Sequence, residues 1–279
     1  MAVTLGERVL ARYRRFSLYN SPFPAHDRGC AIDLYPEGDS GPSVGDAETA
    51  PSPVAGEVVA TREVRAPPKP YAADTDHLVV VDTGDWLARV LHVEPCVAVG
   101  DRVERGEDLG TLVRAGFFAP WVPNHLHLGF RHPGDDPYRA SGSLPIEVDV
   151  TVEGLDWEGT GTVVESGDTW ARLDAPAHPA PGEFFVGLAS GEGVLDGGFP
   201  HYDGGGLLGG GREATIAGAT VGTVDGRHVD WRDVTVLANG EPVTGIALFC
   251  AQDDFGVKLV GEALDLPVGT DIVVDVEEA

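Results

Sequence analysis

Short apolar runs separated by turn residues form the main pattern along this chain. In many of them apolar and polar side chains alternate, which is the period-two pattern of a strand that buries one face. Glycine (38) and proline (21) punctuate the runs, and this mixture favours short strands and tight turns over long helices. In the first half of the chain we expect strands at Gly56–Arg65, His77–Asp82, Trp86–Val93, Leu109–Val113 and His125–Arg131.

Two segments of the first half depart from this pattern. Near the N-terminus, Val9, Leu10, Tyr13 and Phe16 fall near helical spacing, so we expect a short amphipathic helix there. Residues 38–53 are polar and rich in glycine and proline, and this composition predicts a loop.

The strand pattern restarts after the turn-rich stretch at 133–137. Turn residues then separate further short strands, as in an all-β sandwich or barrel. They are expected at Gly161–Glu165, Glu183–Leu188, Gly245–Ala251 and Asp271–Val276. Between them, the glycine-rich residues 197–211 predict a flexible loop. That loop lacks the preceding strand and following helix of a phosphate-binding site.

These patterns predict an all-β fold in two domains. We expect an N-terminal segment at residues 1–21, a first β-domain at 22–145 and a second all-β domain of unknown role at 146–279. A length of 279 residues suffices for two ordinary domains.

The formal net charge is −26 and the isoelectric point is about 4.4. A surface of this sign repels phosphate groups, so nucleic acids and anionic membranes are poor partners. Lys69 and Lys258 are the only lysines. Many carboxylates with few lysines are typical of proteins from a salt-rich cytoplasm, where ionic strength screens self-repulsion. The alternative is an ordinary acidic protein.

Cysteines and apolar runs add constraints on location. Cys30, Cys96 and Cys250 are odd in number and widely spaced, which argues against a disulfide framework or a cysteine-rich zinc site. No run approaches the ~18 apolar residues of a membrane span. The N-terminal residues lack the apolar core of a signal peptide, so we expect a cytoplasmic protein.

The sharpest chemical signal is the pair His125 and His127. Alternate residues of a strand point to the same side, so the two imidazoles converge on one spot. The apolar residues Leu126, Leu128 and Phe130 anchor the opposite face, which places the histidine face over a groove or cavity. An isolated pair of this kind is more often two ordinary histidines on a polar face.

His26 and Asp33 form a second signal, and His92 a third. An imidazole and a carboxylate together suit zinc. Asp33 lies in an apolar strand, where an unpaired carboxylate is costly, so it needs a metal, a hydrogen-bond donor or an arginine such as Arg28. His92 ends an apolar strand and alone would be a core or edge histidine.

Five pieces of sequence then follow one another in a recognisable order. His26 and Asp33 precede Pro53-Val54-Ala55-Gly56-Glu57-Val58, and a strand ending in His92 follows. Next come the turn sequence VAVGDRVERGEDLG at 97–110 and His125-Leu126-His127-Leu128. Over about residues 22–133 the chain resembles the lysostaphin/LytM family of zinc endopeptidases. That family has the duplicated hybrid motif fold, a β-sandwich or barrel; the resemblance does not extend into the C-terminal half.

The resemblance implies a site and a reaction. His26, Asp33 and His127 would bind Zn²⁺ and leave its fourth position to water. His92 and His125 would be catalytic, taking up the proton of that water and stabilising the oxyanion. The substrate would be a peptide or peptide-like molecule, in this family often glycine-rich or a peptidoglycan cross-link.

The chain departs from the family at its first ligand. The family has H-x-x-x-D, but Gly29 stands four residues before Asp33, and His26 stands seven before it. On a straight strand that offset points His26 to the opposite face. Arg28-Gly29 can form a bulge, because glycine accepts positive φ. We therefore expect His26 to fold back toward the metal, with His77 as a weaker substitute.

Three other functions compete with a peptidase. The same fold would serve as a non-catalytic metal- or ligand-binding module. A phosphotransfer protein of similar fold would use His92 and His127, by fold analogy alone. A biotinyl or lipoyl carrier, suggested by the turn at 97–110, needs a lysine at a hairpin tip, and neither Lys69 nor Lys258 has that context.

Overall fold

The computed structural model describes residues 1–36 and 49–279, and these residues form two compact units. The first unit comprises residues 1–16 and 23–150, and the second comprises residues 17–22 and 151–279. Strands are almost the only regular secondary structure in both, so the predicted all-β fold in two domains is confirmed. No helix in the described residues has the length and apolar character needed to span a membrane.

The first unit contains all of the site residues expected from the sequence. Its elements are β1 (Val3–Gly6), α1 (Glu7–Leu10), β2 (Arg15–Ser17, which ends at the division), η1 (Pro24–Gly29), β3 (Ala31–Tyr35), β4 (Thr49–Pro51), β5 (Gly56–Arg65), β6 (Thr75–Asp82), β7 (Leu87–Leu91), β8 (Val93–Pro95), β9 (Arg102–Val103), β10 (Asp108–Leu112), β11 (Leu126–Arg131) and β12 (Ile146–Asp149).

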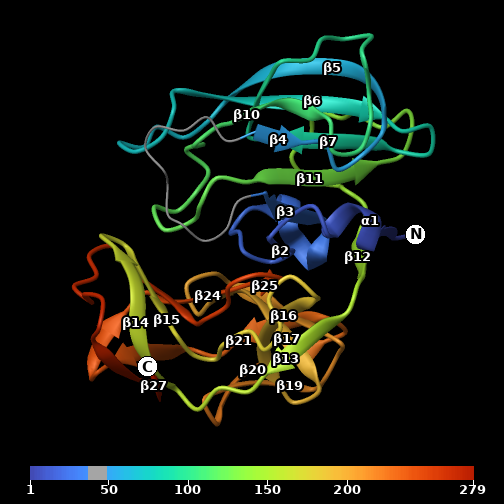
Figure 1. The fold of residues 1–279 in the computed structure, drawn as a ribbon. Helices are drawn as coiled ribbons and strands as arrows, with labels where there is room; N and C mark the ends of the chain where they lie inside the picture. The colour runs from blue at the N-terminus through green and yellow to red at the C-terminus, as the bar shows by residue number, and fades with distance from the viewer. Residues whose placement is uncertain (37–48) are drawn as a thin grey trace. The chain divides into compact units, whose positions relative to one another are not determined.

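An antiparallel sheet organises this unit. Its strands lie side by side in the order β5, β6, β7, β11 and β3 (Figure 1). β11 lies between β7 and β3, and all six of its residues are buried. Leu126, Leu128 and Phe130 occupy one face as the alternation predicted. The opposite face, which carries His127, is buried as well.

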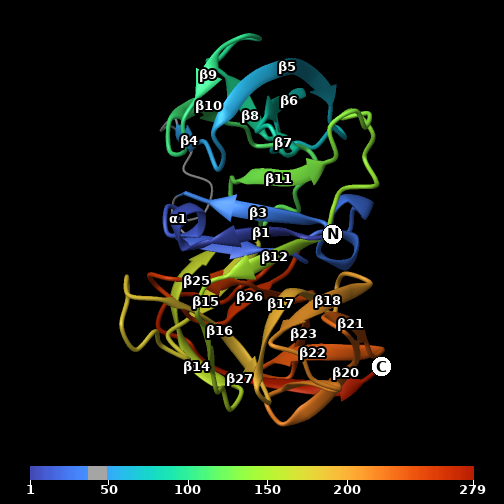
Figure 2. The same cartoon turned by 90° about the vertical axis from the view of Figure 1, so that its right-hand side faces the viewer.

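The N-terminal residues contain a strand beside the short helix that was expected there. β1 pairs in parallel with β12, from Val3 opposite Ile146 to Gly6 opposite Asp149 (Figure 2). Helix is limited to the four residues of α1, because tertiary pairing overrides the helical spacing. The first unit therefore includes residues 1–16 and extends to Val150, beyond the 22–145 expected from the sequence.

The predicted polar loop at 38–53 lies mostly in residues 37–48, outside the described residues. Its end, Thr49–Pro51, is strand β4, which pairs with β10.

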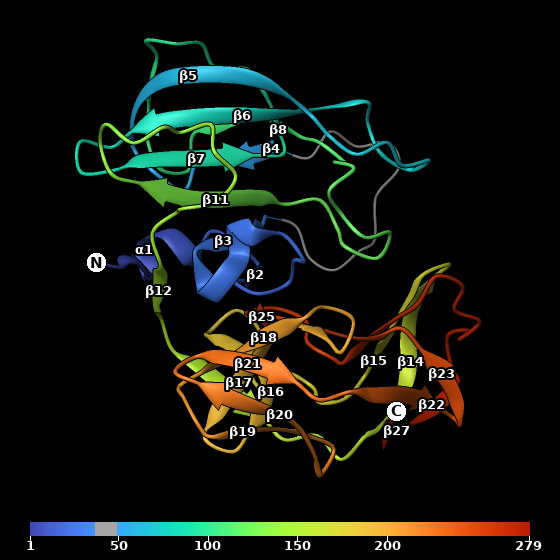
Figure 3. The ribbon, with the colours of Figure 1, turned by 180° about the vertical axis from the view of Figure 1, so that it is seen from behind.

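The second unit is also a series of short strands. They are β13 (Val152–Leu155), β14 (Thr160–Gly167), β15 (Trp170–Leu173), β16 (Phe185–Ser190), β17 (Gly193–Phe199), β18 (Gly204–Leu208), β19 (Glu213–Ile216), β20 (Ala219–Asp225), β21 (His228–Trp231), β22 (Val234–Ala238), β23 (Glu241–Val243), β24 (Gly245–Leu248), β25 (Cys250–Ala251), β26 (Lys258–Val260) and β27 (Asp271–Glu278). The figures label them by the same names (Figure 3).

The glycine-rich segment 197–211 was wrongly predicted to be a flexible loop. It contains the end of β17 and all of β18, which pair with each other, and β18 also pairs with β21. A Cβ atom on Gly205 would lie 2.2 Å from Cζ2 of Trp231, and one on Gly206 would lie 2.3 Å from Cδ2 of Tyr19. The glycines therefore make room for aromatic rings against the strands.

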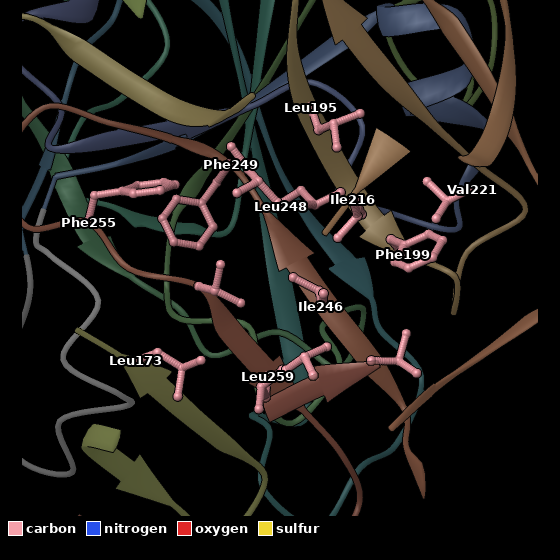
Figure 4. Close-up of a cluster of buried hydrophobic side chains, with 14 of the residues drawn as sticks. Leu173, Leu195, Phe199, Ile216, Val221, Ile246, Leu248, Phe249, Phe255 and Leu259 are labelled. Atoms are coloured by element: carbon pink, nitrogen blue, oxygen red, sulfur yellow. The ribbon is translucent and has the colours of Figure 1, made fainter. Parts of the chain in front are cut away.

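A single apolar cluster fills the second unit. Its members include Leu195, Phe199, Ile246 and Leu259, all fully buried, and Figure 4 shows them gathered from several strands. Burial of this kind stabilises the fold by about 25 cal/mol per Å² of apolar surface.

Candidate metal centre

Strand register brings Asp33 and His127 together. β3 and β11 are antiparallel neighbours, and these two residues are direct partners across the ladder. Their side chains therefore share one face of the sheet. On the other side of β11, His127 is paired with Leu91 of β7, and His92 follows that residue in the chain. The neighbouring strands β3, β11 and β7 thus bring together Asp33, His127 and His92, which lie far apart in the sequence.

His26 reaches the same place through a turn of 3-10 helix. Residues 24–29 form η1, in which the backbone N–H of His26 donates to the Phe23 carbonyl. Arg28 and Gly29 then take positive φ values of 52° and 72°. These two residues reverse the offset that a straight strand would impose. His26 points to the same site as Asp33, as the bulge at Arg28-Gly29 predicted.

Three ligand atoms meet in a small triangle. Nε2 of His26 lies 2.9 Å from Nδ1 of His127. Oδ1 of Asp33 lies 3.2 Å from the first nitrogen and 3.1 Å from the second. Among the residues that the structure describes, these three form the group able to hold a metal ion, and His77 is not a member.

While Asp33 is ionised, no arrangement of protons on the two histidines satisfies all three sides of this triangle. The carboxylate oxygen only accepts, so each nitrogen would have to carry a hydrogen to bond with it. The two nitrogens would then face each other as donors across 2.9 Å. If either nitrogen is bare, its contact with the oxygen joins two lone pairs. A cation at the centre removes the conflict, because all three atoms can then offer lone pairs.

The donor set fits zinc. Two imidazole nitrogens and one carboxylate oxygen are borderline to hard ligands, and three protein ligands with an open position are typical of catalytic zinc. Bonds of about 2.0–2.1 Å in a tetrahedron separate ligand atoms by about 3.3 Å. The observed separations of 2.9–3.2 Å need only a small expansion.

Protonation at neutral pH also suits a cation. Burial acts to raise the pKa of Asp33, but His125, His26 and a hydrogen bond from His127 hold it well below its usual range. Burial lowers the pKa of His125 to about 3 and that of His127 to about 4, against the opposing pull of Asp33. At neutral pH Asp33 is therefore ionised and His125 and His127 are neutral, and metal ligands must be in these states to bind.

His125 lies directly beside the triangle. Its Nδ1 is 2.9 Å from the Pro123 carbonyl, which only accepts, so Nδ1 carries the hydrogen. The other nitrogen, Nε2, is then a bare acceptor 3.4 Å from Oδ2 of Asp33. The Phe118 ring stacks on the His125 imidazole with centroids 4.3 Å apart. This histidine is fixed in one orientation and one tautomer.

His92 has a partner that the sequence motifs did not reveal. Its Nδ1 lies 2.6 Å from Oδ2 of Asp76, a residue with no exposed surface. The His92 ring lies 5.3 Å from the His125 ring and 5.8 Å from the His127 ring, between centroids. The signal for Asp76 was available: it is an acidic residue in the apolar run TDHLVVVD, and a buried carboxylate requires a donor.

The centre is enclosed. His26, Asp33, His92, His125 and His127 are each 7% exposed or less. Aromatic rings pack over the two histidines that are not in the triangle, with Phe118 on both of them and Tyr35 beside His125.

Arg114 holds the segment that carries Phe118. Its guanidinium donates to the carbonyls of Ala119, Pro120 and Val122. One arginine thus fixes the cover of the site through three backbone acceptors.

Two family models match the chain. The domain of unknown function (DUF8155) N-terminal domain matches residues 4–148, and the domain of unknown function (DUF8155) C-terminal domain matches residues 153–277. The chain belongs to the DUF8155 family. All residues of the DUF8155 site lie within the N-terminal match. A search of curated proteins gave no match.

The lowered pKa values of His125 and His127 make the stability of the folded protein depend on pH. His125 and His127 have folded pKa values of about 3 and 4, below the ~6.5 of an unfolded chain. Between about pH 6.5 and 4 the unfolded state binds more protons, so stability falls as pH decreases through this window. Each histidine contributes up to ~1.4 kcal/mol per pH unit. Asp33, with its lowered pKa, loses its contribution only at still lower pH.

Urea unfolding in the presence of a chelator, at pH 7, 6 and 5, measures this slope. The variant His127→Gln should have a shallower slope than the parent protein, because it lacks one titrating group. His132→Gln, at an exposed position, is the matched control and should keep the parent slope. A stability independent of pH between 7 and 5 would contradict the assignment of neutral, buried histidines.

Proposed function

We propose that the first unit is a zinc-dependent endopeptidase that hydrolyses a peptide bond with metal-activated water. The observation that carries the proposal is the triangle of Nε2 of His26, Oδ1 of Asp33 and Nδ1 of His127, whose three contacts no set of protons on the two histidines satisfies while Asp33 is ionised. The order of the site residues in the chain supports the lysostaphin/LytM resemblance as the source of this chemistry.

The backbone around the motif glycines also supports this resemblance. A Cβ on Gly56 would lie 2.2 Å from the Asp82 carbonyl oxygen, and one on Gly110 would lie 2.0 Å from the Glu94 carbonyl oxygen. Gly100 and Gly106 have φ values of 97° and 84°, in the region that favours glycine. At each of these four positions a side chain would therefore either clash with a backbone carbonyl or strain the backbone.

The residues around the triangle have the features that peptide hydrolysis requires. A bound zinc ion would lower the pKa of water toward ~7 and polarise the scissile carbonyl. His125 presents Nε2 as a bare base beside Asp33 and can take up a proton there. His92 lies next to it, where its ring, once it has taken up a proton, can donate to developing negative charge on the substrate oxygen. Phe118 and the other rings exclude bulk water, which strengthens these interactions.

Zinc-dependent cleavage of peptides tests this proposal. The full-length protein, stripped by chelation and reloaded with zinc, should cleave oligoglycine-containing or mixed-sequence fluorogenic peptides. His125→Ala should lower kcat/KM by roughly 10²–10⁴-fold, the usual contribution of a general acid or base, and should retain zinc. His132→Ala is the matched control and should keep both. Cleavage that survives removal of the metal would refute a zinc mechanism.

One observation favours a second candidate, a non-catalytic metal-binding module with the same fold. All five site residues are buried, whereas a peptide substrate needs a path to the metal. In that case zinc binds in stoichiometric amount and no peptide is cleaved. The variant Phe118→Ala separates the endopeptidase from the binding module. In an endopeptidase whose metal is covered by the Phe118 ring, the variant should increase kcat/KM. In a binding module it should produce no peptide cleavage.

A further inference from the structure

Asp76 is a buried carboxylate in contact with His92. The carboxylate has no exposed area. Its Oδ1 accepts a hydrogen bond of 2.7 Å from the backbone N–H of His77, and its Oδ2 lies 2.6 Å from Nδ1 of His92. Both oxygens are therefore engaged, one by the backbone of its own strand and one by the imidazole. This geometry leaves the carboxylate little freedom to turn.

Two backbone hydrogen bonds hold His92, one to β6 and one to the residue that follows β10. Its N–H donates to the His77 carbonyl at 3.2 Å, and its carbonyl accepts from the N–H of Val113 at 2.8 Å. The residue has a φ of 70°, a left-handed conformation that is uncommon for residues other than glycine. Such strain is found preferentially where a side chain must be aimed at one point.

We propose that Asp76 is the positioning residue of His92. The carboxylate only accepts, so it fixes the hydrogen of His92 on Nδ1 and leaves Nε2 bare. It also holds the ring beside His125 and His127, at 5.3 Å and 5.8 Å between centroids. The inference rests on the proposed function for its kinetic consequence, but the tautomer of His92 follows from Asp76 whether or not the protein is an enzyme.

Replacing Asp76 with asparagine should invert the tautomer. The side-chain oxygen of the amide would continue to accept from the N–H of His77, which turns its NH₂ group toward His92. That group donates, so Nδ1 of His92 must accept, and the hydrogen moves to Nε2. A bare Nε2 is then replaced by an N–H. In a Ser-His-Asp protease the corresponding change costs about 10⁴-fold in kcat with the geometry intact.

Nitrogen NMR of the full-length protein with ¹⁵N-labelled histidine tests the first step. The parent protein should show His92 with a protonated Nδ1 and a bare Nε2, and Asp76→Asn should show the reverse. His92→Gln assigns the signal by removing it. A His92 that is protonated on Nε2 in the parent protein, or a tautomer that Asp76→Asn leaves unchanged, would overturn the proposal.

Kinetics and metal content test the second step. In an active protein Asp76→Asn should lower kcat by 10²-fold or more, with KM and zinc content near those of the parent. The double variant, Asp76→Asn with His92→Gln, should have a kcat no lower than that of the slower single variant. The two residues act as one unit, so the second change removes nothing further. Full additivity of the two losses, or an unchanged kcat, would overturn the positioning role.

Asp196→Asn provides the matched control. Asp196 is a fully buried carboxylate in the second unit that accepts from Ser17 and from the backbone of Leu18. This variant should lower stability and leave the His92 signal and kcat unchanged. A general effect of losing a buried carboxylate would move the His92 signal in both variants and would count against a specific role of Asp76. If the parent protein cleaves no peptide, the proposed function fails while the NMR result still decides the role of Asp76.

Discussion

Replacing His26 with alanine is expected to remove zinc as completely as replacing His127. Each residue supplies one corner of the triangle, and their nitrogens lie at similar distances from Oδ1 of Asp33, 3.2 and 3.1 Å. A partner that only supports a ligand already accounts for 10–100-fold in metal affinity. Loss of a ligand itself should exceed this range. Two remaining ligands would also leave the Asp33 charge poorly compensated in a buried site.

Metal analysis and zinc titration of purified protein measure this effect. The parent protein should contain close to one zinc per chain, and the two alanine variants should contain little. His77→Ala is the informative control, because His77 was the alternative first ligand in the sequence and does not belong to the triangle. Zinc binding that survives His26→Ala and disappears in His77→Ala would reassign the first ligand.

The second large effect is expected from salt. With a net charge of −26, the chain repels itself, and the range of this repulsion depends on ionic strength. The Debye length grows from ~8 Å at physiological salt to ~30 Å at 0.01 M. The folded state brings the carboxylates closer together than the unfolded state does, so low salt destabilises it. We expect a melting temperature on the order of 10 °C lower at 0.01 M than at multimolar potassium chloride.

Thermal melts across this range of potassium chloride, with zinc content held constant, provide the measurement. Melts at low salt with added sucrose are the control, because sucrose favours the compact state without screening charge. Recovery of stability by sucrose alone would assign the effect to solvent exclusion. A melting temperature that is equal or higher at low salt would contradict the expected adaptation to high salt.

Local alternation and spacing predicted much of the site, and long-range pairing explains what they missed. His125 and His127 were expected on one face of a strand, and the conformational freedom of Gly29 indicated how His26 could turn back. Asp76 was missed because its role depends on which histidine the neighbouring strand presents. The register of β6 against β7 decides this, and no motif in the sequence encodes it.

The second unit shows the same limit. Composition predicted a loop at 197–211, because glycine lowers strand propensity when a residue is considered alone. The deciding factor is the aromatic partner of each glycine, such as Trp231 for Gly205. Likewise, helical spacing near the N-terminus could not reveal that β12 supplies a parallel partner for β1.

The excursion of residues 17–22 into the second unit constrains the order of events during synthesis. Ser17 donates to Oδ1 of Asp196, 179 positions later in the chain, and the N–H of Leu18 donates to Oδ2 of the same residue. A ribosome releases this segment early and its acceptor late. The second unit can therefore be completed only after most of the polypeptide has emerged. Pairing across so great a separation is intrinsically slow, and residues 17–22 can join the second unit only after residues far downstream of them have been made.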